Sequence, residues 1–272
     1  MAESRIYRAK SIQEIQQILK ASKGAVPVAG ATTFSIYCDD GAINIGSEIL
    51  ALNDVAQLKH IHKNDRYIDF GSCVTLNEVI LRGRQNVPKV LYDALNVVGN
   101  MAIRSVATIG GNIAMKNPFT ASYLPLLALD AQCELCTEKE VFWLPVSKYL
   151  SNDLENDRHV LLRIRIKDEE WTYNVYRKVK NGQYMEEIPI FLFLAKMQKN
   201  NVLDVRLLFA DKKLIRQKEF DNLLLGLSLP IKDENLSDII SKAHEIFPNE
   251  EFSSSFNKQC FFNLLEKSLY NM

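Results

Sequence analysis

Two short loops rich in glycine and threonine carry the residues best suited to binding chemistry. The first is Val28-Ala-Gly-Ala-Thr-Thr33, which continues a short apolar run at Ala25–Ala29. Small residues after a buried strand let backbone N–H groups approach a ligand, and threonine hydroxyls add hydrogen bonds. Such a loop can hold phosphate without formal charge. Taken alone, however, an ordinary strand-to-loop turn is the better explanation.

The second loop is Val106-Ala-Thr-Ile-Gly-Gly-Asn-Ile113, in which Thr108 and Asn112 flank a pair of glycines. Adjacent glycines in apolar sequence indicate positive φ or a close approach of the backbone to another group. A packed turn explains them equally well. The two loops together are more informative, because they could hold the two phosphates of a dinucleotide between them.

Other chemistries are disfavoured by the motifs. Neither loop has the Gly-Lys-Ser/Thr of a Walker A loop or the spacing of a Rossmann fingerprint, and no Gly-x-Ser-x-Gly elbow is present. Cys133 and Cys136 have C-x-x-C spacing but no second pair, so we expect buried, reduced thiols and no metal site. The four histidines are also dispersed, at His60, His62, His159 and His244.

The composition is that of a globular protein without a polyanion-binding field. Lys and Arg total 33 and Asp and Glu total 33 in 272 residues, which disfavours nucleic acid and anionic membranes as partners. No apolar stretch reaches the roughly 18 residues of a membrane-spanning helix. The N-terminal residues lack the apolar core of a secretory signal, so a cytoplasmic location is expected.

The elements that position the loops are mixed helices and strands. Capping boxes at Ser11–Glu14 and Thr75–Glu78 predict two helix starts, the first helix extending to Ser22. Alternation of Leu162, Ile164 and Ile166 with basic residues predicts a half-exposed strand. Further strands are expected at Ala25–Ala29, Ile49–Leu52, Tyr67–Phe70, Gln132–Thr137, Val141–Leu144, Thr172–Val179 and Val202–Phe209, and helices at Lys89–Val98, Pro125–Leu129, Pro189–Gln198, Leu236–Phe247 and Phe256–Leu269.

The segment Val97-Val-Gly-Asn-Met-Ala-Ile-Arg-Ser-Val-Ala-Thr-Ile-Gly-Gly-Asn-Ile-Ala114 resembles the FAD-binding (medium) subunit of the molybdenum hydroxylases. Asn117-Pro118 and Leu126–Ala131 follow in the order found in that family, which includes chains of the xanthine dehydrogenase and carbon monoxide dehydrogenase type. Ala29–Thr33 stands where the family has an Ala-Gly-Gly-Thr-Asp type of loop. The resemblance extends over nearly the whole chain.

The resemblance implies an α+β fold with a p-cresol methylhydroxylase-like FAD-binding part and a C-terminal α/β domain of the carbon monoxide dehydrogenase flavoprotein type. The domains expected are residues 1–53, 54–169 and 170–272. It also implies that FAD is the cofactor and assigns its contacts, while no side chain is expected to act as acid, base, nucleophile or metal ligand. The implied FAD-binding residues are Val28, Ala29, Gly30, Ala31, Thr32, Thr33, Thr108, Ile109, Gly110, Gly111, Asn112, Leu161 and Lys178.

Two positions and one segment depart from the family pattern. Ala31 replaces a glycine, which is tolerable only where that residue does not need positive φ. Ala121 replaces an acidic residue, and the segment after Lys178 has Gly182-Gln183 and an acidic pair, Glu186 and Glu187, in place of Arg-Arg and Asp. These departures motivate one alternative, a flavin-free structural subunit.

The function implied by the resemblance is electron transfer within a complex. Electrons would pass from 2Fe-2S clusters through FAD to NAD+ or another acceptor. Because this chain has no cysteine cluster for iron and sulfur, the clusters and the molybdopterin would belong to a small and a large partner subunit. A stand-alone FAD oxidoreductase is the further alternative, although no histidine or tyrosine is marked as a proton-transfer group facing the flavin.

Overall fold

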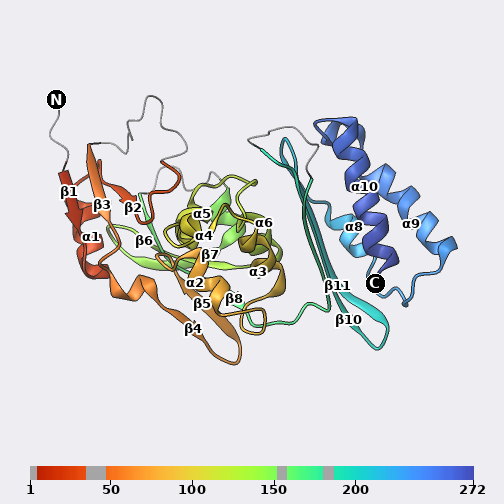
Figure 1. Ribbon diagram of the computed structural model, residues 1–272, viewed down its shortest axis with the longest axis horizontal. Helices are drawn as coiled ribbons and strands as arrows, with labels where there is room; N and C mark the ends of the chain where they lie inside the picture. The colour runs from red at the N-terminus through yellow and green to blue at the C-terminus, as the bar shows by residue number, and fades with distance from the viewer. Residues whose placement is uncertain (1–4, 35–46, 152–157, 180–186) are drawn as a thin grey trace. The chain divides into compact units, whose positions relative to one another are not determined.

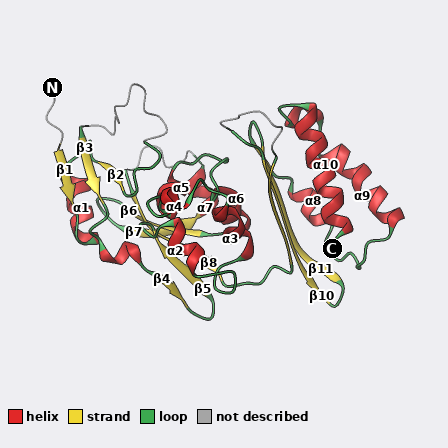
Figure 2. Ribbon diagram, viewed as in Figure 1, coloured by secondary structure: helices red, strands yellow, loops and turns green. Residues whose placement is uncertain are grey.

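The computed structural model describes residues 5–34, 47–151, 158–179 and 187–272, which form two compact units (Figure 1). The first unit comprises residues 1–87, 95–116 and 129–168, and the second comprises residues 88–94, 117–128 and 169–272. Helices and strands are both abundant in each unit, as Figure 2 shows, so the α+β class is confirmed. The three-part division expected from the sequence remains a prediction.

The first unit begins with a small parallel sheet in the order β1-β3-β2. Its strands are β1 (Arg5–Arg8), β2 (Val26–Val28) and β3 (Glu48–Ala51), and helix α1 (Ile12–Ala21) connects β1 to β2. Ser11 caps α1 by accepting a hydrogen bond from the Glu14 N–H group at 3.2 Å. The Glu14 carboxylate accepts from the Lys10 N–H group instead of completing the predicted box with Ser11.

A five-stranded antiparallel sheet in the order β4-β5-β8-β6-β7 forms the centre of this unit. Its apolar face joins α1 and β3 in one core, in which Ile15, Leu50 and Leu162 are fully buried. The strands are β4 (Ile61–Lys63), β5 (Tyr67–Gly71), β6 (Gln132–Cys136), β7 (Val141–Pro145) and β8 (Val160–Lys167), and the unit's short helices are η1 (Ala56–Lys59), α2 (Leu76–Leu81), α4 (Met101–Arg104), α5 (Ile109–Ala114) and α7 (Val146–Leu150).

The alternation predicted along β8 is confirmed. Its polar side chains form bidentate ion pairs with neighbouring strands, Arg165 with Asp69 on β5 at 2.7 Å and Arg163 with Glu134 on β6. The Arg165 guanidinium also lies 4.5 Å from the ring centroid of Trp143 on β7. Strands distant in sequence are therefore joined on both faces of this sheet.

The second unit is built on an antiparallel sheet in the order β12-β11-β10-β9. Helices α8, α9 and α10 lie along one side of its long strands in Figure 1. The bounds are β9 (Tyr173–Lys178), β10 (Ile190–Gln198), β11 (Asn201–Ala210), β12 (Leu214–Ile215), α6 (Tyr123–Ala128), α8 (Lys218–Leu223), α9 (Asp233–Ile246), η3 (Asn249–Glu251) and α10 (Ser255–Tyr270). Helix α3 (Lys89–Asn96) crosses the division between the units.

The helix predicted at Pro189–Gln198 is wrong, because Ile190–Gln198 is strand β10, which lies between β11 and β9. The residues from Ile190 to Ala195 are all buried, so both faces of the strand are covered and the sequence shows no alternation. A continuous apolar run of this length fits a buried helix and a buried strand equally well. Pairing with β9 and β11 on its two sides decides the structure.

Candidate functional site

The first glycine and threonine loop leaves the parallel sheet at the end of β2. Backbone hydrogen bonding to the neighbouring strand β3 continues up to this point, since the N–H group of Leu52, directly after β3, donates to the Val28 carbonyl at 2.9 Å. The loop then closes on itself through a bond from the Phe34 N–H group to the Ala31 carbonyl at 3.2 Å. Ala31 has φ of 54°, in the left-handed region that L side chains rarely adopt. Ala31 therefore needs the positive φ that an alanine adopts only with strain.

The second loop supplies the N-cap and first turn of α5. The Thr108 hydroxyl accepts from the Gly111 N–H group at 3.0 Å, while the Ile109 and Gly110 N–H groups donate to the Val74 and Ser72 carbonyls. The Asn112 N–H group donates to the Thr108 carbonyl at 2.9 Å. These backbone donors are thus bonded within the chain, and the Thr108 hydroxyl keeps a proton to donate outward.

The two loops contact each other through backbone atoms. A Cβ added at Gly30 would lie 2.1 Å from the Val106 carbonyl oxygen, far inside contact distance. No residue with a side chain fits at position 30 without moving the second loop. Gly30 therefore brings the two loops together, as the clamp inferred from the sequence requires.

The paired glycines have different roles. A Cβ at Gly110 would lie 2.5 Å from both the Cβ and the carbonyl oxygen of Ser72, so Gly110 is required for packing. A Cβ at Gly111 would meet only the Thr108 Oγ1 atom, at 3.0 Å, and Gly111 is exposed. Neither glycine has positive φ. The packing interpretation therefore applies to Gly110, and the interpretation as a close approach to a ligand fits the exposed Gly111.

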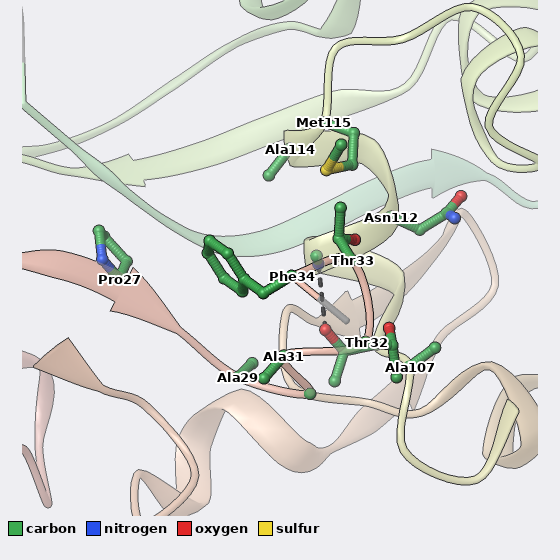
Figure 3. Close-up of a pocket in the computed structure, with 13 residues that line it drawn as sticks. Pro27, Ala29, Ala31, Thr32, Thr33, Phe34, Ala107, Asn112, Ala114 and Met115 are labelled. Carbon is green, nitrogen blue, oxygen red and sulfur yellow. Dashed lines mark hydrogen bonds between the residues drawn. The ribbon is translucent and has the colours of Figure 1, made fainter. Parts of the chain in front are cut away.

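A cavity of about 340 Å³ lies between the two loops (Figure 3). Eight residues predicted from the sequence line it: Ala29, Gly30, Ala31, Thr32, Thr33, Thr108, Gly111 and Asn112. Sequence reasoning missed its other lining residues, although most of them are close neighbours of the two motifs: Pro27, Phe34, Ala107, Ala114 and Met115.

A second cavity of about 250 Å³ shares four wall residues with the first, namely Pro27, Ala29, Gly111 and Ala114. It contains the predicted residues Gly110 and Leu161. The rest of its lining comes from segments that no motif marks: Leu52, Ser72, Lys116, Tyr149, His159 and Val160. One ligand can therefore extend along both sides of Gly111.

Three predicted residues lie elsewhere. Val28 is the last residue of β2, and the Ile109 side chain is fully buried in the protein core. Lys178 is on β9, in the second unit. The geometry thus brings together ten of the thirteen predicted residues in two adjoining cavities of the first unit.

The electrostatic character of the cavities is mildly positive. Lys116 and His159 are the basic residues that line them, and no aspartate or glutamate is among their lining residues. Burial raises the pKa of Tyr149, so its phenol is neutral at pH 7. An electron-rich or anionic ligand fits such a lining better than a cation does.

Metal and thiol chemistry find no support in the described residues. Among them, no group of three His, Cys, Asp or Glu side chains could hold a metal ion. Cys133 and Cys136 are buried and unbridged, and burial raises their thiol pKa values to about 12 and about 11. Cys38 lies outside the described residues. In the same part of the chain, no helix is long and apolar enough to cross a membrane.

Solved structures share this fold over the whole chain. A carbon monoxide dehydrogenase chain from Hydrogenophaga pseudoflava aligns with a TM-score of 0.80 at 17% identity, covering 98% of this chain and 96% of that chain. Quinoline 2-oxidoreductase from Pseudomonas putida 86 has a chain with the same TM-score and identity, covering 100% and 96%. The fold is therefore that of chains found in these oxidoreductases.

A family model described as the FAD binding domain in molybdopterin dehydrogenase matches residues 2–166. The chain belongs to this family, which confirms the resemblance drawn from the second loop, and its cofactor is FAD. The matched range includes both loops and both cavities.

Curated relatives match the sequence at low identity. Indole-3-acetaldehyde oxidase from Zea mays is 28% identical over 174 residues, covering 61% of this chain but 12% of the maize enzyme. The chain thus corresponds to about an eighth of that relative's length. The glyceraldehyde dehydrogenase medium chain from Sulfolobus acidocaldarius is 23% identical over 244 residues, covering 86% of this chain and 85% of the relative.

The residues of the site fit FAD on two structural grounds. Gly111 leaves open the space that a Cβ would fill where the two cavities meet. The Ser72 hydroxyl, in the lining of the second cavity, is buried without a hydrogen-bond partner in the described structure. Ligand sites are concave and mostly apolar, with a few polar groups that fix orientation, and these cavities have that character.

Proposed function

We propose that this chain is the FAD-binding electron-transfer subunit of a molybdenum hydroxylase complex of the broad xanthine dehydrogenase type. The observation that carries the proposal is the pair of adjoining cavities between the two loops, in a chain whose family binds FAD. When bound, FAD supplies the redox chemistry, accepting electrons from 2Fe-2S clusters and passing them to NAD+ or another acceptor.

The chain's own residues bind and orient the cofactor in this proposal. The hydroxyls of Thr32, Thr33 and Thr108 donate to the pyrophosphate, and the Asn112 amide adds a further hydrogen bond. Gly30 lets the first loop contact the backbone of Val106 in the second loop, and Gly110 lets the second loop pack against Ser72, while Leu161 gives an apolar contact. The family resemblance also assigns Lys178, on β9, to the cofactor. No side chain is assigned as acid, base or nucleophile.

The partners proposed are a large molybdopterin-binding subunit and a small 2Fe-2S subunit. The archaeal relative, which matches over 85% of its own length, is named as the medium chain of a dehydrogenase. Among the described residues, no group of three His, Cys, Asp or Glu side chains could hold a metal ion of these other cofactors. Substrate choice would belong to the molybdopterin subunit. The unbridged buried cysteines agree with a cytoplasmic location.

An absorbance spectrum of the purified chain, before and after addition of FAD and desalting, tests the cofactor assignment. Retained flavin bands are the expected result. No flavin retention with excess FAD would contradict the proposal and favour a flavin-free structural subunit.

Affinity purification of a tagged chain from its native cells tests the partner assignment. Molybdenum and iron in the eluate, with a larger and a smaller companion chain, are the expected result. A chain that elutes alone with FAD and oxidises a small substrate by itself would favour the stand-alone flavoenzyme.

A further inference from the structure

The second cavity contains a half-buried cation that no described acidic residue neutralises. Lys116 follows the C-cap residue of α5, and its N–H group donates to the Ile113 carbonyl at 3.0 Å. Its φ of 50° is in the left-handed region, which is unusual for a residue with a long side chain. Strained backbone conformations of this kind occur often at ligand sites, and this one lies at the edge of a cavity.

The ring of Tyr149 faces this cation beside the cavity. The Lys116 Nζ atom lies 5.5 Å from the centroid of the Tyr149 ring, within the range of a cation–π interaction. The His159 ring meets the same tyrosine edge to face, with centroids 5.7 Å apart. Tyr149 is 2% exposed, so this arrangement belongs to the packed interior and not to a mobile surface.

A second polar group in the cavity lacks a partner. Ser72 is 4% exposed, and its hydroxyl makes no hydrogen bond in the described structure. Buried hydroxyl groups are almost always hydrogen-bonded, so an exception in a cavity lining is a donor that a bound molecule can satisfy. The remaining lining is largely apolar, with Leu52, Val160 and Leu161. A flat ring with acceptor atoms on its edge satisfies both kinds of wall.

We propose that the second cavity binds a heteroaromatic ring of the dinucleotide, with Lys116 and Ser72 donating hydrogen bonds to acceptor atoms on the ring edge. This inference rests on the proposed function and extends it to residues that neither loop contains. Adenine and isoalloxazine both have this chemistry, because each is a flat ring system with nitrogen or oxygen acceptors on its edge. The experiment below separates them.

The main variant is Lys116→Met, which removes the charge and keeps a long apolar side chain. Lys20→Met is the matched control, because Lys20 is exposed on α1 and lines neither cavity. Dissociation constants for FAD, ADP and FMN are measured by calorimetry on the full chain, and circular dichroism checks that each variant is folded. We expect FAD affinity to fall at least tenfold in Lys116→Met, to change less than twofold in Lys20→Met and to be largely retained in Lys116→Arg.

The affinities for ADP and FMN, which are the two halves of FAD, and the midpoint potential of bound FAD identify the ring. If isoalloxazine occupies the cavity, Lys116→Met weakens FMN, leaves ADP unchanged and lowers the potential, since a cation beside the ring favours its anionic reduced form. If adenine occupies the cavity, ADP weakens while FMN and the potential are unchanged. Either pattern supports the inference.

Ser72→Ala provides a readout that a structural role would not give. Because the hydroxyl has no hydrogen-bond partner among the described residues, its loss should leave thermal stability unchanged or higher while FAD affinity falls severalfold. A folded Lys116→Met chain that binds FAD, ADP and FMN as the wild type does would overturn the inference and leave the proposed function intact. A wild-type chain that binds none of the three would overturn both.

Discussion

The two units of this protein differ in how they use their interiors. The second unit is closed around aromatic side chains, and the Phe261 ring contacts five other phenylalanine rings, with centroids 5.0 to 6.0 Å apart. The loops of the first unit are built from small residues, a backbone contact at Gly30 and a left-handed alanine, and they enclose cavities. Dense aromatic packing stabilises the second unit, while glycine and other small residues leave room for a ligand in the first unit.

The largest effect is expected from emptying the closed core. Phe261→Ala should lower the free energy of unfolding by about 3 to 5 kcal/mol, because the surrounding rings cannot collapse fully into the space. Chemical denaturation measures this loss. Phe256→Ala, on the same helix and 45% exposed, is the control and should cost well under about 1 kcal/mol. Similar losses at both positions would contradict the comparison.

A pH-dependent cost is expected in the same unit. Asp221 is 5% exposed, and burial raises the pKa of its carboxyl from 3.8 to about 6, against the opposing effects of the Leu207 N–H group, Arg216 and Arg206. The folded state therefore favours the protonated acid. Its stability relative to a neutral residue is fully kept below about pH 4 and decreases as pH rises to about 6, by about 3 kcal/mol in total.

Asp221→Asn should consequently gain stability over the wild type between pH 4 and 7, because its amide oxygen still accepts from the Leu207 N–H group. Unfolding curves at each pH measure the difference between the two proteins. The exposed Asp238→Asn substitution on α9 is the control and should show little pH-dependent difference. A constant difference for Asp221→Asn across this range would refute the assignment.

The paired glycines sharpen the comparison within the first unit. Gly110→Ala should lower the free energy of unfolding by about 2 kcal/mol, because its methyl group overlaps the Ser72 backbone. Gly111→Ala should leave stability equal or raise it by about 0.5 to 1 kcal/mol, since alanine favours a helix, but should weaken FAD binding. Gly111→Val should abolish FAD retention in a folded protein.

Thermal melting and flavin content after desalting separate these outcomes. The expected pattern is a loss of stability at position 110 and a loss of ligand at position 111. Unchanged flavin occupancy in Gly111→Val would remove the basis for the clamp between the two loops.

The smallest effect is expected at Ala31. Ala31→Gly relieves a left-handed conformation that costs about 1 kcal/mol, and the greater freedom of the unfolded chain offsets part of the gain. We expect a rise of about 1 to 3 °C in the melting midpoint and stronger FAD binding. Gly83→Ala is the reverse control, because Gly83 has φ of 80° with open space around its Cβ position and should lose stability. Unchanged FAD binding would mean that Ala31 is neutral for the cofactor.

Local rules explain which parts of the structure could be predicted. The box at Thr75 and Glu78 involves atoms three residues apart, and both of its hydrogen bonds are present in α2. Alternation along β8 reports one polar and one apolar face. β10 was missed because burial on both faces leaves no such signal, and only pairing with distant strands distinguishes it from a helix.

The same distinction holds for the site. Both loops were identified because each carries its small residues and hydroxyls within eight consecutive positions. Tyr149, His159 and Ser72 were missed because they reach the second cavity from separate segments that the sheet order brings together. Their residue types alone do not predict that they line the same cavity.

The internal hydrogen bonds in the first turn of α5 also affect the free energy of cofactor binding. The N–H groups of Ile109, Gly110 and Gly111 are bonded to protein acceptors without any cofactor present. This segment has little conformational freedom left to lose, so cofactor capture does not require it to fold around the ligand. Its amide hydrogens should exchange slowly with solvent in the free chain, and the energy released on binding is then kept as affinity instead of being used to order the loop.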